Sequence, residues 1–152
     1  MSMFCYQCEQ TAMGTGCTVR GVCGKDETTA SLQDLLIYAT KGIAQYAHRA
    51  RRLGASDREV DVFVVEALFT TVINVDFDPE RLRGWLVKAG EIKAKAKKLY
   101  EDAAARAGVT PEQPDGPATW EPAADLDGLV EQAKAVGVLS RREKLGDDIT
   151  GL

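Results

Sequence analysis

All four cysteines of this 152-residue chain lie close together near its N-terminus, in the stretch CYQCEQTAMGTGCTVRGVC. Cys5, Cys8, Cys17 and Cys23 follow the spacing C-x2-C-x8-C-x5-C. Thiols grouped in this way can form disulfides, a tetrahedral zinc site or an iron–sulfur cluster. Disulfides are the least favoured use, because the N-terminus is not a secretory signal peptide and the rest of the chain predicts an ordinary helical core. The spacing itself does not separate zinc from iron.

The cysteine segment is also rich in glycine, and this composition favours the cluster. Glycine lets backbone N–H groups approach sulfur atoms, and N–H to sulfur hydrogen bonds tune the potential of a cluster. Glycine equally permits tight turns around any metal, so zinc stays open as the alternative. The glycines are Gly14, Gly16, Gly21 and Gly24; the apolar neighbours that either shield a cluster or pack on the helices are Phe4, Tyr6, Val19 and Val22.

Three helices are predicted to follow and to position this segment. The first runs from about residue 29 to Gly54, and the second from about residue 57 to 72, behind an SDRE capping box with Ser56 as its N-cap. The third begins at Pro79 behind the cap Asp78 and ends at Gly108. Their predicted buried stripes are Leu32, Leu35, Leu36, Ala39, Ile43, Tyr46, Ala47 and Ala50; Val62, Val65, Leu68, Phe69 and Val72; and Leu82, Trp85, Leu86, Ala89, Ile92, Ala96 and Leu99.

The remainder of the chain predicts a connector and one short helix. Four prolines between residues 109 and 122 make a regular element improbable there. A short amphipathic helix is expected from about residue 124 to 136, ended by Gly137, and Asp147 and Asp148 resemble the cap of a further helix. We therefore expect an all-α protein with a Cys-rich segment at 1–27 and a three-helix bundle at 28–108, followed at 109–152 by a connector, a short helix and the start of a truncated second helical bundle.

Composition excludes several classes of function. The formal net charge of -4 argues against a nucleic-acid surface, and the basic run KAKAKKLY at 93–100 predicts a solvated helix face with buried aliphatic stems. The N-terminus is not a secretory signal peptide, so we expect a cytoplasmic protein. No apolar run is long enough to cross a bilayer, so we expect no membrane partner. His48, Glu27, Glu59 and Glu66 read as ordinary solvated or capping side chains, and no catalytic triad or phosphate-binding loop is present.

The residues MFCYQCEQTAMGTGCTVRGVCGK, followed by LQDLLIYATKGIAQYA, resemble the N-terminus of the hybrid cluster protein family, also called prismane proteins or hydroxylamine reductases. The resemblance covers all four cysteines, Gly16, Gly24, Lys25 and the start of the first helix, with ALFTTVINVDFD and ATW agreeing more loosely. It implies that Cys5, Cys8, Cys17 and Cys23 bind a cluster. The compact spacing is similar to the 4Fe-4S class rather than the 2Fe-2S class, so we expect a 4Fe-4S cluster, with a 2Fe-2S cluster or zinc as the alternative.

The same resemblance implies a longer parent protein. Family members reduce hydroxylamine to ammonia, or reduce nitric oxide, at a second, hybrid iron–sulfur–oxygen cluster held by a His, Glu residues and several Cys in later domains. That hybrid cluster is not expected here, because every cysteine is already used and His48 is the only histidine. We expect a fragment that is inactive alone, whose partners are the missing C-terminal domains and an electron-donating reductase or ferredoxin-like protein.

Two other functions remain as alternatives. One is a free-standing helical interaction module with a structural four-cysteine zinc site. The other is a small, independent ferredoxin-like electron carrier. Metal content separates the zinc module from both iron–sulfur readings.

Overall fold

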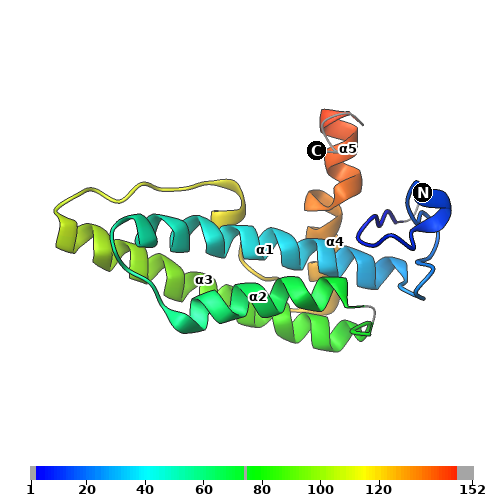
Figure 1. The fold of residues 1–152 in the computed structure, drawn as a ribbon, viewed down its shortest axis with the longest axis horizontal. Helices are drawn as coiled ribbons and strands as arrows, with labels where there is room; N and C mark the ends of the chain where they lie inside the picture. The colour runs from blue at the N-terminus through cyan, green and yellow to red at the C-terminus, as the bar shows by residue number, and fades with distance from the viewer. Residues whose placement is uncertain (1–2, 74, 147–152) are drawn as a thin grey trace. The chain divides into compact units, whose positions relative to one another are not determined.

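The computed structural model describes residues 3–73 and 75–146 (Figure 1). In these residues five α-helices and two 3-10 turns follow one another, and no strand occurs beyond one bridging pair, Cys5 with Cys17. The predicted all-α class is confirmed. The elements are η1 (Ala12–Gly14), α1 (Glu27–Arg52), α2 (Arg58–Val72), α3 (Pro79–Ala107), η2 (Gly116–Thr119), α4 (Leu126–Val136) and α5 (Val138–Leu145).

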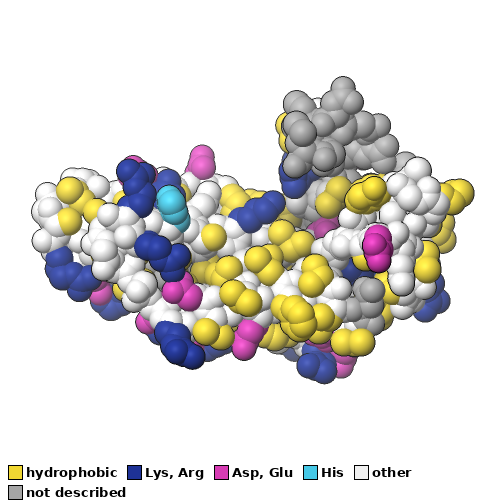
Figure 2. Space-filling view, in the orientation of Figure 1, with side chains coloured by type: hydrophobic (Ala, Val, Ile, Leu, Met, Phe, Trp, Pro, Cys, Tyr) yellow, Lys and Arg dark blue, Asp and Glu magenta, His cyan; other side chains and the backbone are white. Residues whose placement is uncertain are grey.

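Helix α1 follows its sequence pattern closely. The Asp26 carboxylate accepts the Thr29 N–H at 2.8 Å and so caps the first turn. The last turn carries three arginines, which suit the negative end of the helix dipole, and Gly54 follows with a φ of 79°. The predicted apolar stripe is buried, apart from the half-buried Ala47. His48 is exposed, as expected for a surface side chain (Figure 2).

The predicted cap of α2 is wrong by one residue. Asp57, rather than Ser56, caps this helix, because its Oδ1 accepts the Val60 N–H at 3.1 Å. Glu59 does not close a capping box with Ser56; its carboxylate instead binds the Lys95 ammonium of α3 at 2.8 Å. A carboxylate on the neighbouring position displaces the hydroxyl, since Asp serves as well as Ser at an N-cap and also gains the Lys95 charge.

The predicted buried face of α2 is also wrong. Phe69 and Val65 are 61% and 67% exposed, and Val62, Leu68 and Val72 are exposed with them. The buried side chains include Val60, Phe63 and Ala67 instead. Because α2 is apolar on nearly every side, the three-and-four spacing fits two opposite faces, and packing selects the one that carries Phe63. Figure 2 shows the exposed apolar side chains gathered over α2.

Helix α3 begins and ends as predicted, with one correction on its basic run. Asp78 Oδ1 accepts the Glu80 N–H at 2.9 Å, and Gly108 ends the helix with a φ of 67°. Lys93 is not on a solvated face: its side chain is 5% exposed, and its ammonium donates to the Trp120 carbonyl and binds Glu121 at 2.7 Å. The connector supplies these acceptors, so burial of Lys93 depends on a segment that sequence periodicity cannot place.

The helices contribute to two compact units. In the unit formed by Leu36–Phe69 and Trp85–Pro122, each pair of helices is in contact. The Tyr46 and Tyr100 rings link α1 to α3 at 6.5 Å between centroids, and the Phe63 and Trp85 rings link α2 to α3 at 5.6 Å. An ion pair of 2.6 Å between Arg51 and Asp61 joins α1 to α2.

The other unit comprises the described parts of Met1–Leu35, Thr70–Gly84 and Ala123–Leu152. Here the first turns of α1 hold the turn before α3, because Gln33 Nε2 donates to the Asp76 carbonyl at 3.3 Å. Helix α4 begins behind the cap Asp125, within two residues of the prediction. Helix α5 was not predicted, and Asp147 and Asp148 lie outside the described residues. Among the described helices, every one is too short or too polar to span a bilayer.

Candidate metal centre

The first and third cysteines are held side by side by their own backbones. The Cys5 N–H donates to the Cys17 carbonyl at 3.0 Å, and the Cys17 N–H donates to the Cys5 carbonyl at 2.9 Å. The Thr11 hydroxyl adds a 3.1 Å bond to the Cys5 carbonyl. The loop between them is therefore closed on itself, which brings two of the four predicted ligands onto neighbouring positions.

Two glycines are required by close approach in this segment. Gly16 has a φ of +126°, and a Cβ on it would lie 2.5 Å from the Phe4 ring. A Cβ on Gly21 would lie 3.0 Å from the Cys23 sulfur. Neither position accommodates a side chain without movement of its neighbours. Of the apolar residues near the cysteines, Phe4 packs over Gly16, whereas Tyr6, Val19 and Val22 are exposed and do not pack on the helices.

Cys17 has the most developed sulfur environment. It is buried with Met3 and Ala30, the latter on α1, so the segment is anchored to the start of that helix. The Cys17 sulfur accepts the Ala12 N–H at 3.4 Å, and the Thr11 hydroxyl lies 3.7 Å away. The Ala12 N–H, with help from the Val22 N–H, lowers the pKa of Cys17 below its ordinary value, although burial of the thiol opposes this. These donors favour a thiolate.

Cys5 lies beside a buried lysine. Lys25 is 2% exposed, and its ammonium lies 3.7 Å from the Cys5 sulfur and 2.9 Å from Gln7 Oε1. Sequence reasoning assigned no role to Lys25 or to Thr11. Lysine is rarely buried, so its type gave no signal, and only the folded segment shows that it lies beside the Cys5 sulfur.

The chemistry of the donor set fits an iron–sulfur cluster. All four thiols are free of disulfides, and Cys5, Cys8 and Cys23 are partly accessible. A backbone N–H donates to the Cys17 sulfur, and a cation lies beside the Cys5 sulfur. Within residues 3–73 and 75–146, no group of three or more Cys, His, Asp or Glu side chains is placed to hold a metal ion.

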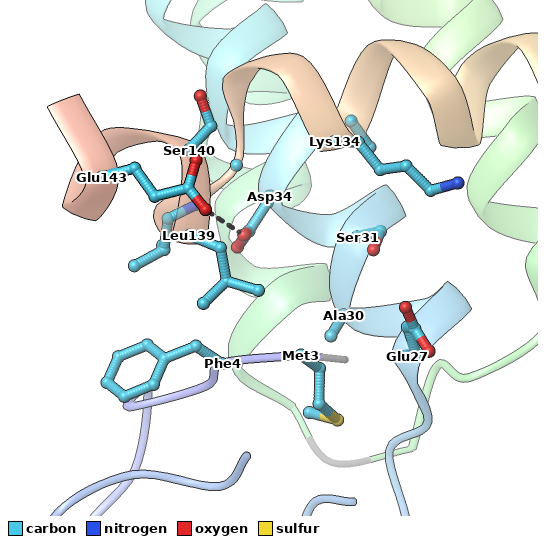
Figure 3. Close-up of a pocket in the computed structure, with 13 residues that line it drawn as sticks. Met3, Phe4, Glu27, Ala30, Ser31, Asp34, Lys134, Leu139, Ser140 and Glu143 are labelled. Carbon is cyan, nitrogen blue, oxygen red and sulfur yellow. Dashed lines mark hydrogen bonds between the residues drawn. The ribbon is translucent and has the colours of Figure 1, made fainter. Parts of the chain in front are cut away.

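A separate cavity of about 250 Å³ borders the cysteine segment, which contributes Met3 and Phe4 to its wall (Figure 3). Its other walls come from α1, α4 and α5, with Glu27, Ser31, Asp34, Lys134 and Glu143 among the polar side chains. The Asp34 carboxylate accepts the Val138 N–H at 3.1 Å, at the first residue of α5. An α1 side chain thus caps α5, which explains why the sequence around α5 did not predict a helix.

The chain is similar to known proteins over almost its whole length. The sequence profile of the Prismane/CO dehydrogenase family matches residues 3–151. The chain is 48% identical over 150 residues to a hydroxylamine reductase of Rhodospirillum rubrum, covering 99% of this chain and 27% of the relative. Hydroxylamine reductases of Geobacter sulfurreducens and Methanocella arvoryzae are 52% and 49% identical over 91% of this chain, and over 26% and 25% of their own lengths.

The chain spans about a quarter of the length of these curated relatives. The match includes the whole cysteine segment and all the described helices. The chain therefore belongs to the Prismane/CO dehydrogenase family.

Proposed function

We propose that Cys5, Cys8, Cys17 and Cys23 bind an iron–sulfur cluster of the 4Fe-4S type, and that this portion transfers electrons within a longer hydroxylamine reductase. One observation carries the proposal: the backbones of Cys5 and Cys17 are paired, and the Cys17 sulfur held in this way accepts the Ala12 N–H. Thiolate ligands with N–H donors to sulfur are characteristic of iron–sulfur sites. Membership of an iron–sulfur family supports the same assignment.

When bound, such a cluster supplies one-electron transfer. The chain's own residues would hold it and set its surroundings. Thr11 and the Ala12 N–H orient Cys17, and Gly21 leaves the Cys23 sulfur free of a crowding Cβ. Cys8 and Cys23 are partly accessible, and we propose that they complete the ligand set with Cys5 and Cys17.

We extend the relatives' printed activity to the parent protein as a proposal. Reduction of hydroxylamine to ammonia and water takes up an electron pair and two protons. We propose that a cytoplasmic reductase or ferredoxin-like protein donates these electrons singly at the cysteine site. The remaining domains of the longer protein would then supply the second cluster and the substrate pocket. Nitric oxide is the alternative substrate.

This chain alone should not turn over hydroxylamine. The four cysteines are assigned to one cluster, and the single histidine, His48, is an exposed side chain on α1. The measurement is ammonia production by the purified, chemically reduced chain. Sustained, cluster-dependent production would refute the assignment of catalysis to the remaining domains.

Metal analysis tests the cluster itself. The chain would be purified without oxygen, and iron, zinc and acid-labile sulfide measured per polypeptide. About four irons with as many sulfides are expected for the 4Fe-4S site. One zinc without sulfide would instead establish the structural-zinc module. Cys8→Ser and Cys23→Ser should each lower the iron content, whereas Val19→Ala, an exposed change in the same segment, should not.

A further inference from the structure

Lys25 is a buried cation without a carboxylate partner among the described residues. Its ammonium contacts a neutral amide oxygen, Gln7 Oε1 at 2.9 Å, and the Cys5 sulfur at 3.7 Å. The adjacent Asp26 does not serve it, because that carboxylate caps α1 through the Thr29 N–H. A buried charge is costly unless an opposite charge compensates it. Such a charge must come from elsewhere in the segment.

The backbone fixes Lys25 in this place. The Gly21 N–H donates to the Lys25 carbonyl at 2.8 Å, and the Gly24 N–H donates to the Gly21 carbonyl at 2.9 Å. The stem of Lys25 lies so near Gly21 that a Cβ there would come within 3.0 Å of it. The Lys25 side chain therefore runs from the end of the cysteine segment back to Gln7, a residue that lies between Cys5 and Cys8 in the sequence. Its position is built into the turn.

Thiolates are the anions that this site offers. The Lys25 ammonium lies 3.7 Å from one of them, the Cys5 sulfur. Four thiolates around an iron–sulfur core carry a net negative charge, and reduction adds another. Net charge and hydrogen bonds to sulfur are among the factors that set the potential of such a cluster. A fixed ammonium favours the reduced form.

We propose that Lys25 is a positioning residue that raises the reduction potential of the cluster held by Cys5, Cys8, Cys17 and Cys23, by placing its ammonium against the Cys5 sulfur. This inference rests on the proposed function. The competing role is purely structural: a clip between Gln7 and the turn at Gly21. If Lys25 were only structural, its replacement would lower the iron and sulfide bound per chain. If its charge sets the potential, its replacement would change the reduction potential while iron and sulfide stay constant.

The experiment is an anaerobic redox titration of the whole chain, with iron and sulfide measured on each sample. Lys25→Met removes the charge and keeps a chain of similar length, and Lys25→Arg keeps the charge. Arg20→Met is the matched control, because it removes an exposed cation from the same segment. Lys25→Met should shift the one-electron equilibrium at least tenfold toward the oxidised form, equal to 59 mV. Lys25→Arg should stay near wild type, and Arg20→Met should shift less than Lys25→Met.

An unchanged potential in Lys25→Met with full iron and sulfide would overturn the inference and leave the proposed function intact. If Lys25→Met fails to load, Lys25→His decides the matter. Its potential should rise, relative to wild type, as the pH falls through the imidazole range, and a parallel pH profile would refute tuning. Wild-type chain without iron and sulfide would refute the proposed function, and the inference with it.

Discussion

Gly16→Ala should lower the free energy of local opening of the loop that the Cys5–Cys17 hydrogen bonds close. The backbone of Gly16 has a φ of +126°, which side chains rarely adopt, and such strain costs about 1 to 3 kcal/mol. The new Cβ would also lie 2.5 Å from the Phe4 ring, so the ring must move. Gly24 provides a matched control, because its φ is +97° but nothing lies within 4 Å of its Cβ.

The assay is hydrogen exchange on the metal-free chain, read at the Cys5 and Cys17 amides. These two amides form the reciprocal bonds that close the loop, so they report its opening directly. About 1.4 kcal/mol corresponds to a tenfold change in an equilibrium constant, and Gly16→Ala should speed both amides by at least about tenfold. Gly24→Ala should have a smaller effect on the same amides. Equal effects of the two substitutions would show that the Phe4 contact does not hold the loop.

Three further predictions concern the helices. Asp57→Ala should lower the free energy of unfolding, measured in urea, by about 1 kcal/mol at neutral pH, and Ser56→Ala by less than about 0.5 kcal/mol. The Lys95 ammonium lowers the pKa of Asp57 in the folded chain. The contribution of Asp57 to the free energy of unfolding is therefore complete above the ordinary aspartate pKa of about 3.9 and disappears as the pH falls through the lowered native pKa. At that acid pH the stabilities of Asp57→Ala and wild type should converge. Phe63→Ala should cost about 3 to 5 kcal/mol and Phe69→Ala less than about 0.5 kcal/mol by thermal unfolding, and the reverse order would restore the predicted face. Asp34→Ala should fray α5, seen as faster proteolysis within residues 138–145, and unchanged cleavage would contradict its capping role.

Sequence patterns predicted the helices that carry clear start and stop residues. Gly54 marks the end of α1, and Asp78 and Gly108 mark the two ends of α3, whereas the Asp26 cap of α1 is seen only in the structure. Both have one apolar face, so periodicity located their buried stripes. The same periodicity predicted the wrong buried face for helix α2, because a helix that is apolar on nearly every side has no unique buried face.

The features that escaped prediction depend on residues far apart in the sequence. Helix α5 receives its cap from Asp34, which lies 104 residues before Val138. Lys93 is buried because the connector returns to it, and Lys25 because the segment folds back to Gln7. Cysteine spacing identified four candidate ligands, but spacing holds no information about which side chains surround a sulfur once the loop has closed.

The reciprocal bonds between Cys5 and Cys17 also bear on how tightly the segment can bind metal. Bringing together the ends of a flexible loop of about 12 residues costs on the order of 2 kcal/mol in chain entropy. In the folded chain the two backbone hydrogen bonds between Cys5 and Cys17 already hold the ends of this loop together. A metal centre that uses both cysteines would then gain roughly 30-fold in affinity over the same ligands on an open chain. Preorganisation by two backbone hydrogen bonds would thus raise the affinity of the proposed metal site above that of an unfolded peptide of the same sequence.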